Sequence, residues 1–111
     1  MELQIRDERD ASMCVLTLEG EVDVYTAPTL KEKLVDNIER GCSNVLVDME
    51  RVSFIDSSGL GVLVSALRRA RERGGSVRIL CTRDNILKIF RITGLDKVFP
   101  IFSDIAKARQ F

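Results

Sequence analysis

One short segment, the run Val45–Met49, constrains the fold more than any other part of the chain. Its residues are apolar with a single interruption, Asp48. A strand with one face in water alternates apolar and polar residues, whereas a strand covered on both faces is almost continuously apolar. The run therefore predicts a central, covered strand, as in α/β proteins with parallel strands.

The segments on either side of this strand alternate between strand and helix patterns. Short apolar runs predict further strands at Leu3–Ile5, Met13–Gly20, Val77–Cys81 and Lys97–Ile101. Apolar residues at helical spacing predict helices at Thr26–Gly41, Ser57–Arg73 and Asn85–Thr93, and a last helix after Ser103. A turn at residues 10–12 makes the first two strands a hairpin, and right-handed crossovers are expected to join the later strands. A chain of 111 residues suffices for one core, so we expect a single domain over residues 1–111.

Three polar residues are placed to cap the predicted helices. Thr26 precedes a proline that is tolerated in a first turn, Asp84 precedes the third helix, and Ser103 precedes the last. Each could accept a hydrogen bond from a free backbone N–H group, so we expect all three to be N-caps.

Composition excludes several classes of function. The chain has 17 basic and 17 acidic residues, so its formal net charge of zero gives no reason to expect nucleic acid or an anionic membrane as a partner. No apolar stretch is long enough to span a bilayer, and the start of the chain is charged and mixed, so the cytoplasm is the expected location. Histidine is absent, which excludes Ser–His or Cys–His catalysis and His-ligated metals within the chain.

The cysteines offer no recognisable framework. There are three, Cys14, Cys42 and Cys81, without a CxxC pair. An odd number argues against a disulfide framework, and the spacing argues against a zinc site. Cys14 and Cys81 lie in apolar runs and are expected to be small core residues. No cofactor is expected.

Polar residues follow two of the predicted strands. Asp23 and Thr26 follow the second strand, and Asp56 and Ser57 follow the third. In α/β sheets, sites form beyond the carboxyl ends of parallel strands. If these two strands are parallel, the four residues gather on one rim of the sheet.

Ser57 has two possible roles. It could be an N-cap, or it could be an exposed hydroxyl that accepts a phosphate, with Asp56 as the cap instead. Gly59 and Gly61 lie in the first turns of this helix, where glycine costs about 0.5–1 kcal/mol of stability relative to alanine. Two such residues therefore indicate a requirement other than helix stability. They serve either close packing against the strands or access for a partner. Ser58, the weaker phosphoacceptor candidate, cannot face the same way as Ser57, since one residue turns a helix by about 100°.

A phosphate on Ser57 would change the surface without unfolding the helix. It would add about −1.5 to −2 charges, which a helix N-terminus tolerates. Asp56, and to a lesser degree Asp23, would lie near the added charge. We therefore expect a switch that works by charge and bulk.

The chain resembles the small STAS-domain anti-sigma factor antagonists of bacteria, of the SpoIIAA and RsbV type, and looks particularly like BldG-type members from actinobacteria. The resemblance rests on the order Asp56-Ser57-Ser58-Gly59-Leu60-Gly61 and covers nearly the whole chain. The other matching stretches are Leu18–Asp23, Glu21–Pro28, Val45–Asp48, Phe54–Val62 and Ile86–Leu95.

This resemblance implies a fold and a mechanism. The fold is an α/β STAS domain, a small mixed β-sheet with helices packed mainly on one side. The unphosphorylated protein would bind an anti-sigma factor that is also a serine kinase and so release a sigma factor. The kinase would use ATP and Mg²⁺ to phosphorylate Ser57 and end the binding, and a PP2C-type phosphatase would restore it. The residues expected to flank the phosphate or contact the partner are Asp23, Thr26, Asp56, Ser58, Gly59, Gly61 and Val62.

Two other functions stay open. The same fold could serve as an interaction module of another complex, such as a stress-signalling or lipid-transport assembly. An enzyme using Asp23, Asp56 and Ser57 is disfavoured, because without histidine no general base of suitable pKa is evident. We therefore expect a regulatory binding protein without enzymatic activity.

Overall fold

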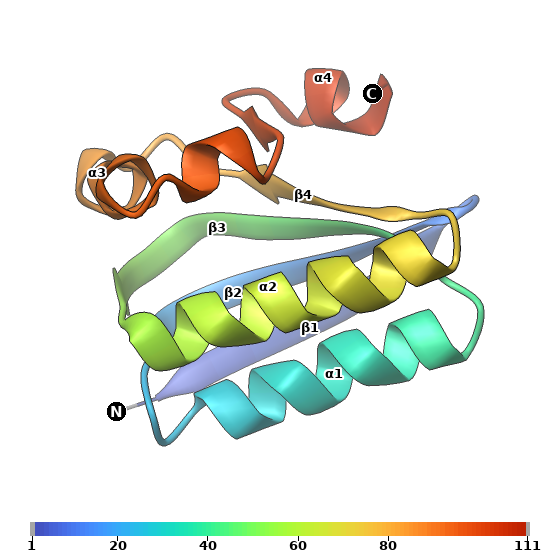
Figure 1. Ribbon diagram of the computed structural model, residues 1–111, viewed down its shortest axis with the longest axis horizontal. Coiled ribbons are helices and arrows are strands. Elements are labelled where there is room, and N and C mark those ends of the chain that lie inside the picture. The colour runs from blue at the N-terminus through green and yellow to red at the C-terminus, as the bar shows by residue number, and fades with distance from the viewer. Residues whose placement is uncertain (1, 111) are drawn as a thin grey trace.

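A five-stranded mixed sheet organises the chain in the computed structural model, which describes residues 2–110 (Figure 1). The strands lie in sequence order: β1 (Leu3–Asp10), β2 (Met13–Val22), β3 (Asn44–Ile55), β4 (Ser76–Leu80) and β5 (Ile101–Phe102). β1 and β2 form an antiparallel hairpin, and all later neighbours are parallel. The α/β fold class with a small mixed sheet is thereby confirmed.

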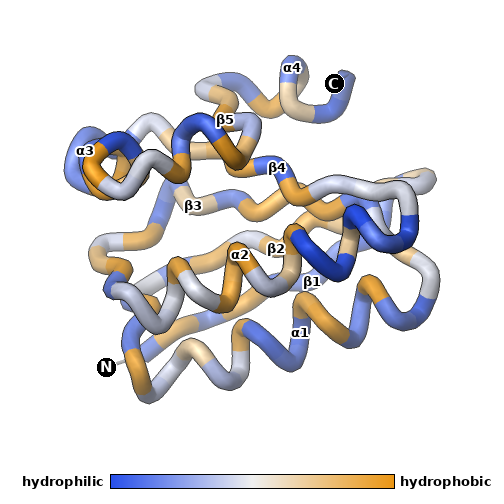
Figure 2. The backbone as a smooth tube through the Cα atoms, viewed as in Figure 1, coloured by the Kyte–Doolittle hydropathy of each residue, from blue (hydrophilic) through white to orange (hydrophobic). Residues whose placement is uncertain are grey.

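Most of the helices cover one face of this sheet. α1 (Ala27–Glu39) and α2 (Ser57–Glu72) run side by side across it, and α3 (Asp84–Ile92) packs against the same core (Figure 1). The contacts come from apolar residues at helical spacing, visible as recurring orange bands in Figure 2. The fully buried ones include Leu30, Leu34 and Ile38 of α1 and Leu63 of α2. Each such side chain contributes about 1.5–3 kcal/mol when buried.

The last helix, α4 (Ile105–Gln110), lies on the opposite face of the sheet. Its buried Ala108 packs with a second, smaller cluster that includes Met13, Val15 and Leu46. Arg78 on β4 donates a hydrogen bond to the Ala108 carbonyl at 3.1 Å. This cluster covers the second face of β3 at its first residues, as the run Val45–Met49 predicts. None of the helices within residues 2–110 is long and apolar enough to cross a membrane.

The strand and helix bounds differ from expectation in two places. β3 continues to Ile55, well past Met49, and Val52 and Ile55 are buried although the charged residues Glu50 and Arg51 separate them from the apolar run. Irregular pairing with β2 near Glu19 and Gly20 breaks the simple alternation. Instead of a strand over 97–101, a 3-10 helix (Leu95–Lys97) is followed by the two-residue β5.

Of the three capping predictions, the one for Thr26 is correct in position, and those for Asp84 and Ser103 are wrong. Thr26 occupies the N-cap position of α1, but its side chain makes no cap hydrogen bond. Asp84 is already the first residue of α3, after an N-cap at Arg83 without a side-chain bond. At α4, Asp104 Oδ1 rather than Ser103 accepts a hydrogen bond, from the Ala106 N–H at 2.7 Å.

The expectation against a disulfide is also wrong. Cys14 of β2 and Cys42 of the α1–β3 loop are joined by a disulfide, with their Cα atoms 6.2 Å apart. The odd number of cysteines could not reveal this, because the pairing is spatial. The β2–α1–β3 crossover brings the chain back to the N-terminal end of β2, where Met13 pairs with Asn44. Cys81 is a buried free thiol, as expected.

Gly59 and Gly61 have different structural roles, although they lie two residues apart on α2. A Cβ atom at Gly59 would lie 2.5 Å from Val22 Cγ1 and 2.8 Å from Ile55 Cγ1. A Cβ atom at Gly61 would meet nothing within 4 Å. Gly59 therefore lets the start of α2 approach the ends of β2 and β3, whereas Gly61 leaves the surface open.

The two glycines should respond oppositely to alanine. Gly59→Ala forces a methyl group into the Val22–Ile55 contact, and we expect a loss of about 1–3 kcal/mol in the free energy of unfolding. Gly61→Ala adds a helix-favouring residue in open space and should gain about 0.5–1 kcal/mol. Urea denaturation of both variants measures this. Equal effects at the two positions would contradict the packing described for Gly59.

Candidate functional site

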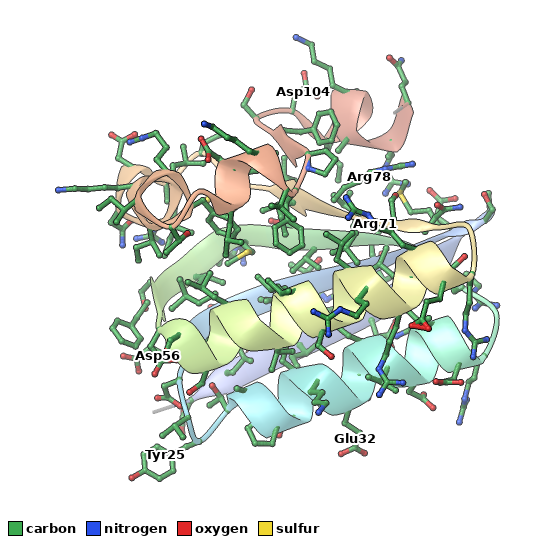
Figure 3. All side chains as sticks on the ribbon, in the orientation of Figure 1. Tyr25, Glu32, Asp56, Arg71, Arg78 and Asp104 are labelled. Atoms are coloured by element: carbon green, nitrogen blue, oxygen red, sulfur yellow. A yellow bond between two sulfur atoms is a disulfide. The ribbon has the colours of Figure 1, made fainter. Side chains whose placement is uncertain are left out.

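The ends of β2 and β3 define one rim of the sheet. Val22 and Ile55, their last residues, are paired, and the Asp56 N–H donates to the Val22 carbonyl at 3.1 Å. Asp23 and Asp56 therefore leave the sheet next to each other. Figure 3 shows Asp56 and Tyr25 at this same end of the molecule. The prediction that the two acidic loops share a rim is confirmed.

Asp56 is the N-cap of α2. Its backbone is extended, and its Oδ1 accepts hydrogen bonds from the N–H groups of Ser58 at 2.9 Å and Gly59 at 3.3 Å. Its carbonyl oxygen accepts from the Leu60 N–H at 3.1 Å. Of the two alternatives for the cap, Asp56 rather than Ser57 is correct, and the carboxylate satisfies amides that would otherwise be free.

Ser57 is consequently the first residue of α2 and is exposed. Ser58 is only half-exposed, because it lies one step further round the helix. On the next turn, Gly61 is exposed and Val62 is half-buried against the core. Ser57 thus lies on an open surface directly after the capping residue Asp56, with no bulky side chain at position 61.

Asp23 and Thr26 tie the β2–α1 loop together. Asp23 Oδ1 accepts from the N–H groups of Tyr25 at 2.9 Å and Thr26 at 3.0 Å. Thr26 Oγ1 accepts from the Asp23 N–H at 2.9 Å and donates to the Glu21 carbonyl at 2.8 Å. Asp23 is only 5% exposed and Thr26 9%. Both side chains therefore shape the loop from inside.

The hydrogen bonds of this loop also set the charge state of Asp23. Burial raises the pKa of the Asp23 carboxyl, but the hydrogen bonds from the Thr26 and Tyr25 backbones and from the Thr26 side chain outweigh burial. The net effect holds the pKa of Asp23 below its ordinary value, so the group is ionised at neutral pH. Its second oxygen, Oδ2, is buried without a hydrogen-bond partner among residues 2–110.

Three large apolar side chains lie exposed along the same rim. Tyr25 is 82% exposed, Val24 58% and Phe54 43%. Tyr25 and Val24 are held outward by the turn around Asp23, and Phe54 immediately precedes Ile55 and the cap. Sequence reasoning did not single them out as site residues. The sequence feature that could have indicated them is the pair of apolar residues, Val24 and Tyr25, between the polar Asp23 and Thr26.

The arrangement is suited to recognition. The described residues hold no group of three or more cysteine or acidic side chains placed to bind a metal ion. An exposed serine follows the capping carboxylate in sequence, and exposed apolar side chains lie on the same rim. This combination presents an acceptor for a modifying group on a surface that a protein partner can cover.

Comparisons with known proteins agree with this geometry. Residues 4–108 match the STAS domain family. The anti-sigma-B factor antagonist of Bacillus subtilis is 33% identical over 101 residues, which cover 91% of this chain and 92% of that protein. The anti-sigma-B factor antagonist of Listeria monocytogenes is 37% identical over 95 residues, covering 85% of this chain and 82% of the relative.

Solved structures show the same fold. An anti-sigma factor antagonist from Mycobacterium paratuberculosis has a TM-score of 0.90 at 23% identity, covering 98% of this chain and 92% of that one. SpoIIAA in its unphosphorylated form has a TM-score of 0.75 at 23% identity, covering 99% of this chain and all of that one. The family match, the curated relatives and the fold together show that this chain belongs to the STAS domain family.

Proposed function

We propose that this chain is an anti-sigma factor antagonist switched by phosphorylation of Ser57. In the unphosphorylated state it binds an anti-sigma factor that is also a serine kinase, and a sigma factor is released. The kinase transfers phosphate from ATP, with Mg²⁺, to Ser57, and a PP2C-type phosphatase removes it. We expect the chain to act in the cytoplasm by binding alone; its curated relatives are named anti-sigma-B factor antagonists.

The observation that carries this proposal is that Asp56, and not Ser57, caps α2. The Asp56 carboxylate already holds the amides of Ser58 and Gly59, so the helix start is complete without Ser57. The Ser57 hydroxyl is exposed and free to enter a kinase active site. The same occupancy limits how far the amides at the helix start can neutralise a phosphate, because Asp56 uses two of them.

Phosphorylation therefore changes the charge of the rim more than its shape. A phosphate of about −1.5 to −2 charges would stand next to the Asp56 carboxylate. A partner surface that fits the neutral serine would then face several negative charges and lose its contact. SpoIIAA, a protein of the same fold, has been solved in a phosphorylated form that matches this chain with a TM-score of 0.76. A fold of this kind thus accommodates the modified state.

The partner surface extends from Ser57 to the β2–α1 loop. Gly61 and Val62 continue it along α2, and Val24, Tyr25 and Phe54 supply apolar area. Asp23 and Thr26, also expected to contact the partner, act here through the loop conformation that turns Tyr25 outward. Gly59 contributes by letting α2 approach the rim, as the contacts with Val22 and Ile55 indicate.

A charge at position 57 should weaken partner binding without destabilising the fold. Ser57→Asp places a carboxylate at a helix N-terminus, where it is tolerated, but adds a negative charge to the contact surface. We expect affinity for the cognate anti-sigma factor to fall about tenfold or more, with an unchanged melting temperature. Ser57→Ala should retain binding. Isothermal titration calorimetry and thermal denaturation measure the two effects.

Alanine variants at Ser57 and Ser58 test which of the two serines is phosphorylated. With the cognate kinase and ATP, the wild type and Ser58→Ala should be phosphorylated and Ser57→Ala should not. Peptide mass spectrometry locates the modification. Phosphate on Ser58, or Ser57→Asp binding as tightly as the wild type, would be inconsistent with the proposed switch.

Asp23 should support the loop in a pH-dependent way. Because its pKa is lowered on folding, its ionised form contributes stability above the ordinary aspartate pKa, and this is lost as pH falls through the folded value. Asp23→Asn should therefore be less stable than the wild type at pH 7, and the difference should shrink in acid below about pH 4. Urea denaturation at several pH values tests this, with the exposed Asp84→Asn as control. A difference that grows in acid would refute the assignment.

A further inference from the structure

The Cys14–Cys42 disulfide lies at the end of the sheet opposite the phosphorylation site. Cys14 is the second residue of β2 and pairs with Val45, near the start of β3. Cys42 precedes β3 by two residues, whereas Ser57 follows its end. The α1–β3 loop and the start of α2 are at opposite ends of the molecule in Figure 1. The bond is thus separate from the site that the proposed function uses.

The bond closes a covalent ring around one structural unit. The two cysteines are 28 residues apart in sequence, and the segment between them contains most of β2, the whole β2–α1 loop and α1. Without the bond, α1 is held by apolar contacts and by a few exposed polar ones, such as Asn37 Nδ2 to Asp7 Oδ2 at 3.0 Å. A crosslink that closes a loop of this length removes much of the freedom of the unfolded chain.

The two sulfur atoms are shielded from bulky reagents. Cys14 is fully buried and Cys42 is 3% exposed. The loop around Cys42 is ordered, since its N–H donates to the Asn37 carbonyl at 2.9 Å. In a reducing compartment such as the cytoplasm, disulfides are rare, and those that occur usually form and break in response to redox conditions. Cys42 is the more exposed residue of the pair and therefore the one that a small oxidant would reach first.

We propose that Cys14 and Cys42 are a peroxide-sensitive thiol pair, whose oxidation to the disulfide locks the β2–α1 unit in its folded position and whose reduction releases it. The site is a redox modification site distinct from Ser57. The third cysteine, Cys81, is buried near the other end of β4 and takes no part.

The reaction balances with hydrogen peroxide as oxidant. The Cys42 thiolate attacks one peroxide oxygen and the O–O bond breaks, which leaves a sulfenic acid on Cys42 and a hydroxide that takes the thiol proton to become water. The Cys14 thiolate then attacks the Cys42 sulfur. The S–S bond forms, the S–O bond breaks, and the oxygen leaves as a second water with the proton from Cys14. The two thiols lose two electrons, and one peroxide is reduced to two waters.

The test compares the full-length protein in its two redox states. Protein reduced and then freed of reductant is treated with hydrogen peroxide, denatured in an alkylating reagent and analysed by intact mass and peptide mapping. We expect a Cys14–Cys42 crosslink and alkylation of Cys81 alone. The oxidised form should melt about 10 °C higher than the reduced form, and dithiothreitol should reverse both changes.

Matched variants make the test specific. Cys42→Ser, in the loop, should melt at the same temperature with and without peroxide, whereas Cys81→Ser should respond as the wild type does. Three alkylated cysteines after peroxide, a crosslink to Cys81, or a sulfinic acid in place of the crosslink would overturn the proposal. So would a Cys14–Cys42 crosslink that leaves the melting temperature unchanged.

Discussion

The parallel pairing of β2 with β3 is the interaction on which the rest of the structure depends. It brings the last residues of both strands, Val22 and Ile55, side by side, and so places two loops that are far apart in sequence on one rim. The same pairing, at its other end, brings Cys14 to the loop that precedes β3. The position of α2 follows, because Gly59 seats the helix start directly on the ends of the two strands.

At the start of α2, helix capping and the exposed hydroxyl belong to two different residues, Asp56 and Ser57, although a single serine could have provided both. Asp56 caps the start of α2, and Ser57, where we propose the modification, is left exposed. Since Asp56 and not Ser57 caps the helix, the proposed phosphorylation would alter the surface without a change in the fold. Asp23 has a comparable structural task in the neighbouring loop, where its hydrogen bonds with Tyr25 and Thr26 turn an aromatic side chain toward solvent.

Much of this could be predicted from the sequence, because the strongest signals are local. The apolar run at Val45 and the helical spacing of Leu30, Leu34 and Ile38 indicate strand and helix directly. The shared rim of Asp23 and Asp56 followed from the expected parallel strands. Which residue caps α2 could only be posed as alternatives, since Asp and Ser are about equally good caps.

The features that could not be predicted depend on tertiary contacts. The second half of β3 is buried at Val52 and Ile55 despite the charged residues beside them, and irregular pairing with β2 disguises its alternation. The Cys14–Cys42 bond depends on where the crossover returns the chain. The exposure of Tyr25 depends on the turn that Asp23 stabilises. The secondary-structure propensities of the residues and the spacing of apolar positions do not contain this information.

The central claim is that phosphorylation of Ser57 changes the charge of a helix start that is already complete. Amide hydrogen exchange along α2, compared between the unphosphorylated and the Ser57-phosphorylated protein, tests it most directly. The account predicts unchanged protection at buried positions such as Leu63, Leu67 and Ala70, with differences confined to the first turn. Loss of protection along the whole helix would contradict it, because the switch would then work by unfolding α2.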